Sequence, residues 1–213
     1  MISRISLGEE IVWVCKRLAE RGMIAATDGN VSCRLDRDRF LITPGGRHKR
    51  DLESSDLVVI DRAGAVIGGF GTPSSEVRMH LCVYRARPDV HAVVHAHPPM
   101  LTALTLAGIQ FSADLLPEVW LSVGPVPTAP YATPSTDEVP RAIEGLLEDH
   151  DALLMERHGS LTFAKTLKEA YLRLEKMEHA AHIFFYAQLL KKGPPAPLSR
   201  EELLKLQAVK GPG

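Results

Sequence analysis

Short segments of alternating polarity crowd the first third of the sequence, and they constrain the fold most. Polar and apolar residues alternate or mix over residues 31–35, 40–43, 57–61 and 65–67, and Gly, Pro, Asn and Asp stand between these segments. Successive side chains on a strand point to opposite faces, so the pattern predicts half-buried strands joined by turns. Strands clustered in this way predict a largely antiparallel sheet. The regular strand and helix alternation of a doubly wound nucleotide-binding fold is missing.

Helical patterns are interleaved irregularly with the strands. The expected helices cover residues 8–21, 73–87, 100–107, 133–149 and 167–191, and further strands are expected at 90–97, 152–155 and 161–164. The Pro- and Gly-rich segment 111–132 predicts only short strands and loops. We therefore expect one mixed α/β domain over residues 1–213, with helices on both sides of the sheet. A Pro-rich linker at 193–198 would lead to a short C-terminal helix.

Charge and cysteine content narrow the class of function. Lys plus Arg number 25 and Asp plus Glu number 26 in 213 residues, so no positive excess favours nucleic acid or an anionic membrane surface as a partner. Cys15, Cys33 and Cys82 form no CxxC pair and are odd in number, which is typical of reduced intracellular thiols. Charged residues interrupt the apolar N-terminal segment, which is therefore unlike a signal peptide or a membrane span. We expect a cytoplasmic protein.

The sharpest chemical signal is His95-Ala96-His97, at the end of an apolar strand. Side chains at i and i+2 of a strand share a face and can grip one metal ion, and imidazole suits zinc. A catalytic zinc commonly has three protein ligands, and His158, in a turn between two expected strands, is the candidate for the third. The alternative is that these are ordinary histidines of the core or surface.

Glu76 and three small-residue turns add further candidates. Glu76 follows Pro73-Ser74-Ser75 at an expected helix start, where it could bind a metal or act as a general base, or simply complement the helix dipole. The turns Gly29-Asn30, Gly45-Gly46 and Ser74-Ser75 could cradle a phosphate, although turns need such residues for backbone reasons alone.

A second histidine cluster occurs on the expected long helix. Glu175, Glu178, His179 and His182 have a spacing that could suggest another metal site. We expect instead a polar helix face that meets solvent or a neighbouring subunit.

Taken in order, these motifs resemble the class II aldolase/adducin family. The residues that carry the resemblance are Thr27-Asp28-Gly29-Asn30-Val31-Ser32, Leu41-Ile42-Thr43-Pro44-Gly45-Gly46, Pro73-Ser74-Ser75-Glu76, His95-Ala96-His97, Ala129-Pro130-Tyr131-Ala132-Thr133 and Arg157-His158-Gly159. The similarity runs from about Leu7 to Leu190 and is greatest to the members that cleave L-fuculose 1-phosphate.

The resemblance implies a fold, an assembly and a site. The fold would be an α/β/α sandwich around a mainly antiparallel sheet, and the assembly a homotetramer with active sites between subunits. One zinc ion per subunit would be bound by His95, His97 and His158, with Glu76 as an exchangeable ligand that becomes the acid/base. The substrate phosphate would be bound by residues matching Thr27, Asn30, Gly45, Gly46, Ser74 and Ser75.

The implied reaction is retro-aldol cleavage of a ketose 1-phosphate to dihydroxyacetone phosphate and an aldehyde. Zinc epimerases, decarboxylases and dehydratases that act on sugar phosphates are alternatives with the same fold, because all of them stabilise an enolate or enediolate. A non-catalytic adducin-like module is a further alternative, although such modules lack the metal ligands found here.

The sequence departs from the fuculose-phosphate aldolases at three places. Gly45 stands where they usually carry a hydroxyl residue, and their tyrosines are absent both near Glu118 and in the tail after Leu198. One of those tyrosines donates a proton on the aldehyde side in the family. Glu118 could replace it or be an ordinary loop carboxylate. The departures concern the aldehyde partner rather than the metal ligands.

Overall fold

The computed structural model describes residues 4–210, and the ends of the expected 1–213 unit lie outside this range. Within it, one sheet has the strand order β4-β3-β2-β1-β5-β8-β7-β6. Neighbouring strands are antiparallel except for β6 and β7, which are parallel. The strands are β1 (Asn30–Arg34), β2 (Arg39–Ile42), β3 (Val58–Asp61), β4 (Val66–Gly68), β5 (Ala92–Ala96), β6 (Thr128–Ala129), β7 (Ala152–Met155) and β8 (Gly159–Ala164).

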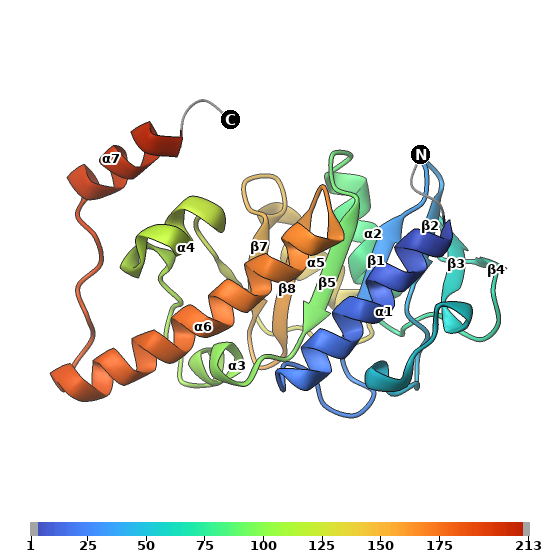
Figure 1. The fold of residues 1–213 in the computed structure, drawn as a ribbon, viewed down its shortest axis with the longest axis horizontal. Helices are drawn as coiled ribbons and strands as arrows, with labels where there is room; N and C mark the ends of the chain where they lie inside the picture. The colour runs from blue at the N-terminus through green and yellow to red at the C-terminus, as the bar shows by residue number, and fades with distance from the viewer. Residues whose placement is uncertain (1–3, 211–213) are drawn as a thin grey trace.

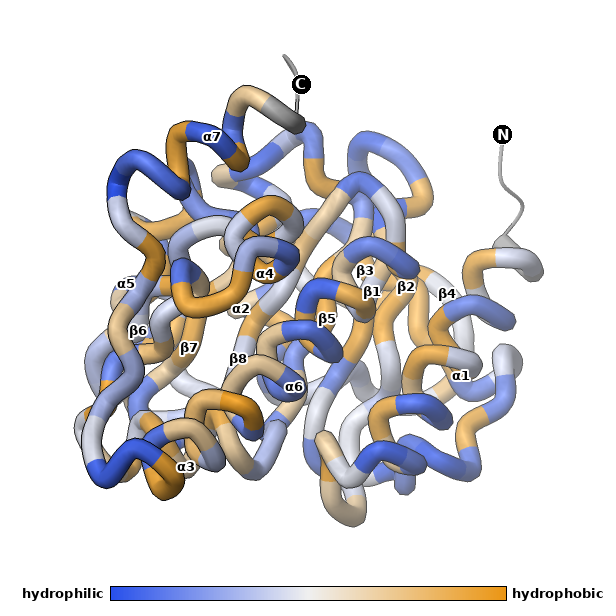
Figure 2. Tube along the Cα trace, turned by 60° about the vertical axis from the view of Figure 1, so that its left-hand side comes forward, coloured by the Kyte–Doolittle hydropathy of each residue, from blue (hydrophilic) through white to orange (hydrophobic). Residues whose placement is uncertain are grey.

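Helices cover both faces of the sheet (Figure 1). One face packs against α1 (Arg4–Glu20), α3 (Pro99–Leu106), α4 (Pro117–Ser122) and α6 (Leu167–Lys191). The other face packs against α2 (Val77–Ala86) and α5 (Glu138–Ile143), and α7 (Arg200–Lys210) lies against α4. Hydrophobic stretches follow the strands, as Figure 2 shows. This arrangement confirms the expected α/β/α sandwich with a mainly antiparallel sheet.

Strand alternation sorts residues between the two cores. On β5, Val94 joins the core on the α1 and α6 side, whereas Val93 joins the core on the α2 and α5 side. His95 shares its face with Val93, because strand side chains alternate with a period of two. The same rule places Ser32 of β1 on the α2 side. The sheet thus presents its central polar residues to α2.

The structure corrects the expectation for residues 111–132. Instead of loops and short strands alone, this segment contains the helix α4, which begins at Pro117. A proline is favourable at the first helical position, where its missing N–H group has no intrahelical partner to lose. The expectation that Pro117 interrupts regular structure is wrong, because Pro117 is the first residue of the helix.

The helix expected from Pro73 begins later, at Val77. Ser74 and Ser75 therefore lie three and two residues before the first helical residue and do not serve as its N-cap. Glu76 occupies the N-cap position without a side-chain capping bond. Its carboxylate is free to point elsewhere, which corrects the simple picture of a first-turn glutamate.

Helix α6 spans the predicted residues Leu167–Lys191. It opens with a capping box in which Thr166 and Glu169 exchange side-chain to backbone hydrogen bonds. One expectation for this helix is wrong, because Glu178 is buried rather than part of a solvent-facing surface. Its carboxylate accepts the backbone N–H groups of Met100 and Leu101, at 2.9 and 3.0 Å, and so caps α3.

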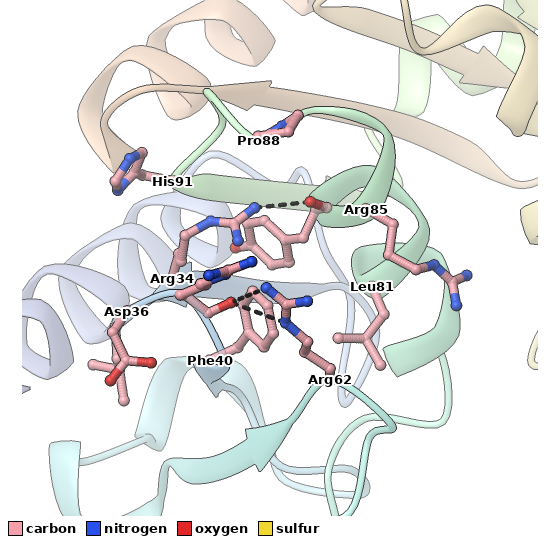
Figure 3. A pocket seen from close by; sticks show the side chains of 11 residues that line it. Arg34, Asp36, Phe40, Arg62, Leu81, Arg85, Pro88 and His91 are labelled. Carbon is pink, nitrogen blue, oxygen red and sulfur yellow. Dashed lines mark hydrogen bonds between the residues drawn. The ribbon is translucent and has the colours of Figure 1, made fainter.

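An arginine-rich pocket lies at the end of the sheet where β1 finishes and β5 starts (Figure 3). Its lining includes Arg34, Phe40, Arg62, Arg85 and His91. Across residues 4–210, none of the helices has the length and apolar character needed to cross a membrane.

Candidate metal centre

Strand direction brings three distant segments together at one end of the sheet. Both β1 and β8 run antiparallel to β5, so the starts of β1 and β8 lie beside the end of β5. Asn30, the first residue of β1, is paired with His95 on β5. His97 follows β5, and His158 immediately precedes β8. The topology therefore gathers side chains that are more than 60 residues apart in the sequence.

The turn between β7 and β8 has a backbone shaped to present His158. Arg157 has a φ of 58°, in the left-handed region that costs a non-glycine residue energy. The N–H of His158 closes the turn on the carbonyl of Met155 at 3.1 Å. A Cβ atom on Gly159 would collide with the carbonyl oxygen of Ala96 and the ring of His97. Only glycine lets β8 approach β5 this closely.

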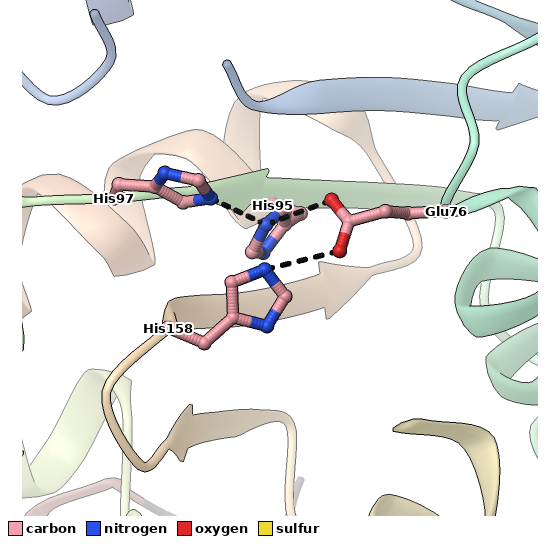
Figure 4. A group of neighbouring side chains, drawn as sticks. All are labelled: Glu76, His95, His97 and His158. Atoms are coloured by element: carbon pink, nitrogen blue, oxygen red, sulfur yellow. Dashed lines mark hydrogen bonds and ion pairs between the residues drawn. The ribbon is translucent and has the colours of Figure 1, made fainter. Parts of the chain in front are cut away.

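Four side chains converge at this point (Figure 4). One potential ligand atom from each of Glu76, His95, His97 and His158 lies within 4.8 Å of the others. The Nε2 atom of His95 is 2.9 Å from Nε2 of His97 and 3.1 Å from Oε2 of Glu76. Nε2 of His158 is 3.0 Å from Oε1 of Glu76. His95 is fully buried, and the other three are partly buried.

The donor set suits a metal ion. Nδ1 of His95 donates to the backbone carbonyl of Ser160 at 2.8 Å, so a neutral His95 carries its lone pair on Nε2. That lone pair faces a carboxylate oxygen and a second imidazole nitrogen. Glu76 Oε1 is buried and has no partner with hydrogen-bond geometry among the described residues. Lone pairs that face one another repel, and a shared cation removes that repulsion.

Local electrostatics favour the metal-binding forms of two of these groups. Burial alone would raise the pKa of Glu76, but His95 and His158 at its two oxygens hold that pKa well below its usual range. Burial, together with the neighbouring His95 and His158, lowers the pKa of His97 to about 3. Metals bind ionised carboxylates and neutral imidazoles, so both shifts prepare the group for a cation.

The six residues predicted for phosphate binding come from the turn before β1 and the first residue of β1, from the loop after β2, and from the segment before α2. Gly45 packs against Pro73 and Ser74, and Pro44 forms an isolated bridge with Pro73. Asn30 donates through Nδ2 to Oε2 of Glu76 at 2.8 Å. The remaining members are Thr27, Gly46 and Ser75, all of which are exposed, and the Ser75 hydroxyl accepts from Ser135. Glu118 lies exposed in the first turn of α4.

A buried lysine that the sequence analysis missed holds two of these loops. Lys49 is 2% exposed, and its Nζ donates to the carbonyls of Thr27 at 2.8 Å, Arg47 at 3.0 Å and Pro44 at 3.4 Å. Burial lowers its pKa. The charge of Lys49 is thus compensated by carbonyl oxygens, which tie the Thr27 turn to the loop after β2.

Three further polar residues were missed beneath Glu76, namely Ser32, His80 and Tyr84. A signal for two of them was present in the sequence. Glu76, His80 and Tyr84 are spaced four residues apart, which places them along one side of a helix. Their link to Ser32 depends on sheet topology that the sequence pattern does not specify.

Comparison with known proteins decides the family. The model of the Class II Aldolase and Adducin N-terminal domain matches residues 9–185. The chain belongs to the class II aldolase and adducin family.

Relatives within the class II aldolase and adducin family differ in the reaction they are named for. A 5-deoxy-D-ribulose 1-phosphate aldolase from Bacillus thuringiensis is 34% identical over 93% of this chain and 92% of its own. A 3-oxo-tetronate 4-phosphate decarboxylase from Escherichia coli is 31% identical over 95% of this chain and 96% of its own. A solved L-fuculose 1-phosphate aldolase superposes with a TM-score of 0.85 and 31% identity, over 95% of this chain and 94% of its own. The chain is thus similar both to aldolases and to a decarboxylase, and both kinds of enzyme cleave a carbon–carbon bond.

Proposed function

We propose that this protein is a zinc-dependent class II aldolase that cleaves a ketose 1-phosphate, such as L-fuculose 1-phosphate, to dihydroxyacetone phosphate and an aldehyde. The observation that carries the proposal is the convergence of three imidazoles and Glu76 beside three polar loops. Relatives named as aldolases of ketose 1-phosphates support the reaction class.

The proposed zinc ligands are His95, His97 and His158, with Glu76 as an exchangeable fourth ligand and one ion per subunit. The bond from His95 Nδ1 to the carbonyl of Ser160 fixes the tautomer that binds a metal through Nε2. When bound, zinc supplies Lewis-acid polarisation of the substrate ketone. Three imidazoles and one replaceable carboxylate are a ligand set that leaves room for a substrate.

Glu76 is the proposed acid/base. Breaking the C3–C4 bond of the ketose leaves an electron pair on C3, and a proton must be added there. Glu76 is the only carboxylate in the group of four, and proton transfer by such a positioned side chain is worth about 10²- to 10⁴-fold in rate. Asn30, which donates to Oε2, holds this carboxylate from one side.

Thr27, Asn30, Gly45, Gly46, Ser74 and Ser75 are the proposed phosphate-binding residues. Phosphate contacts remote from the scissile bond orient the substrate and keep the three-carbon fragment in register with the metal. Lys49 supports this role, because its buried Nζ donates to the carbonyls of Thr27 and Pro44 and so places a positive charge beside both loops.

Decarboxylation of a phosphorylated 3-oxo acid is the second candidate, favoured by the relative of that name. Loss of carbon dioxide also leaves an electron pair beside a carbonyl and also requires a proton at that carbon. The same four side chains would serve either reaction.

Two further features are part of the proposal: the protein is a cytoplasmic homotetramer, and its active sites are completed between subunits.

The deciding experiment offers the zinc-loaded protein L-fuculose 1-phosphate, 5-deoxy-D-ribulose 1-phosphate and 3-oxo-tetronate 4-phosphate. Dihydroxyacetone phosphate and carbon dioxide are measured separately, before and after chelation and after zinc is restored. Dihydroxyacetone phosphate that disappears with chelator and returns with zinc supports the aldolase. Carbon dioxide from the third substrate alone would transfer the proposal to the decarboxylase.

A further inference from the structure

Four buried side chains continue inward from Glu76 as a chain of short hydrogen bonds. Asn30 Nδ2 is 2.8 Å from Glu76 Oε2, and Asn30 Oδ1 is 2.5 Å from Nε2 of His80. Nδ1 of His80 is 2.7 Å from the Ser32 hydroxyl, which is 2.8 Å from the hydroxyl of Tyr84. Each of the four is at most 4% exposed.

The carboxylate of Glu76 sets the direction of the first two bonds. An ionised carboxylate only accepts, so the group of Asn30 that faces it must be the amide nitrogen. The amide oxygen of Asn30 then faces Nε2 of His80. Because that oxygen also only accepts, Nε2 of His80 must carry a hydrogen and donate it.

The donors of the other two hydrogen bonds, His80–Ser32 and Ser32–Tyr84, can be assigned in the same way. His80 is 1% exposed, and burial lowers its pKa to about 3, so the ring is neutral and its Nδ1 carries a lone pair. Ser32 must donate its single hydrogen to that lone pair. The hydroxyl of Tyr84 therefore donates to Ser32, and burial raises the pKa of Tyr84, which keeps this phenol protonated. All four bonds point toward Glu76.

Packing holds Tyr84, at the far end of these hydrogen bonds, in place. The ring of Tyr84 stacks on Phe40 with centroids 4.6 Å apart. The guanidinium of Arg34 lies 4.9 Å from the centroid of the Tyr84 ring, and Arg34 also donates to the backbone carbonyl of Tyr84 at 2.9 Å. Tyr84 is thus a fixed starting point for the chain.

We propose that Tyr84, Ser32 and His80 are positioning residues, because their one-way chain of hydrogen bonds fixes the amide of Asn30 and, through it, the carboxylate of Glu76. This inference rests on the acid/base role proposed for Glu76. If the Asn30 amide rotated by half a turn, its oxygen would face the carboxylate and its nitrogen would face the N–H of His80. Both contacts would be repulsive, so the chain admits one orientation.

The first test reads the tautomer of His80 and needs no activity. The protein is labelled with ¹⁵N-histidine, and the imidazole nitrogens are observed by NMR with and without zinc at neutral pH. The His80 signals are those lost in a His80→Gln variant. We expect a neutral ring protonated at Nε2 in both states. A ring protonated at Nδ1, or at both nitrogens, would overturn the chain as described.

The second test measures kcat, KM and zinc content in Ser32→Ala, which removes the hydroxyl that donates to His80. We expect kcat to fall about tenfold, the lower end of the effect of losing a residue that orients a ligand, with KM within about twofold and zinc content unchanged. Tyr84→Phe, one step further from Glu76 and with its ring packing retained, should give a smaller fall of the same kind.

Thr162→Val is the matched control. Thr162 is as buried as Ser32, and its hydroxyl donates to the carbonyl of Ala170 at 2.8 Å, away from the chain. We expect kcat unchanged in this variant. If Ser32→Ala and Thr162→Val lower kcat equally, the hydrogen-bonded side chains contribute only packing, and the inference fails. A wild-type protein inactive on all three substrates would contradict the proposed function. The tautomer of His80 would still test the directions of the hydrogen bonds, because that measurement needs no activity.

Discussion

Two clusters of ionisable groups lie at opposite ends of the central strands, and they are satisfied in different ways. Beyond the start of β5, Arg87 donates to Asp89 and Asp151 at 2.9 Å each, and Arg173 pairs with Asp151 at 3.0 Å. Arg87 also donates to the carbonyls of Leu147 and His150. Here each donor faces an acceptor. At the other end, a carboxylate oxygen of Glu76 and Nε2 of His97 both lie close to the lone pair on His95 Nε2.

This difference separates a cluster that stabilises the fold from one that is suited to bind. The arginine cluster, with two cations and two anions, is complete within the chain. With neutral imidazoles, the histidine group carries only the charge of Glu76, and a bound metal ion would balance that charge. Burial alone does not distinguish the two, because Arg87 and Arg173 are also largely buried, with side chains 18% exposed. The arrangement of donors and acceptors does.

Removing one imidazole should have the largest effect. In His158→Ala we expect zinc content and cleavage both to fall sharply, because only two imidazoles remain and Glu76 is proposed to leave the metal when substrate binds. Metal analysis after gel filtration, together with the substrate panel, checks this. The matched variant Asp151→Asn, in the arginine cluster, should keep both zinc and activity. Full zinc occupancy in His158→Ala would contradict the ligand set.

Glu76→Gln should come next, because it keeps the shape of the side chain and removes its basicity. We expect kcat to fall about 10²- to 10⁴-fold while the three histidines retain zinc. Circular dichroism and metal analysis establish that fold and ion remain. A variant with nearly normal kcat would exclude Glu76 as the acid/base and shift attention to another proton carrier.

Zinc should raise the free energy of unfolding through the histidine group and independently of the arginine cluster. At free zinc about 100 times Kd, linkage predicts a gain of about 2.7 kcal/mol in the free energy of unfolding. Thermal unfolding with zinc and with chelator measures it. Asp151→Asn should be less stable in both conditions but show the same zinc-dependent gain, whereas His158→Ala should show none. A smaller gain in Asp151→Asn would mean that the two ends are coupled.

The smallest expected effect is a change in acid stability at the arginine end. The side-chain hydrogen bonds of Arg87 lower the pKa of Asp89 relative to the unfolded chain. Asp89 therefore contributes stability above its ordinary pKa of about 3.9, and that stability is lost as pH falls through the lower folded pKa. Asp89 is 46% exposed, so screening limits the effect to about 0.2–1 kcal/mol. Denaturant unfolding of Asp89→Asn from neutral to acid pH should show a flatter acid limb than the wild type.

The sequence was sufficient for elements with strong local signals. The bounds of α6 could be predicted because Thr166 and Glu169 supply a capping box where the apolar stripe begins. Helix α4 was missed because Pro117 stops a helix in its interior and starts one at its first position, and composition does not distinguish these cases.

For the candidate site, the sequence indicated which residues to consider but not their arrangement. His95 and His97 share a strand face, so their proximity follows from local geometry. The meeting of His158 and Asn30 with them depends on three strands being neighbours in the order β1-β5-β8, and the position of Glu76 depends on the segment between the Pro73–Pro44 bridge and α2. The contact between Ser32 and His80 could not be predicted for the same reason, since it depends on β1 lying beside α2.

The glycine at the start of β8 has a consequence for ion size. Because Gly159 lets β8 close against β5, His95 and His158 are anchored to backbones held at the fixed spacing of hydrogen-bonded strands. The ladder fixes the spacing of the two backbones, so the space between the imidazoles can widen only by side-chain rotation. Imidazole nitrogens brought together in this way suit a small ion with short nitrogen bonds of about 2.0–2.1 Å and disfavour calcium, which needs six to eight oxygens at about 2.3–2.6 Å. Discrimination between metals would then depend on the sheet as well as on the ligand atoms.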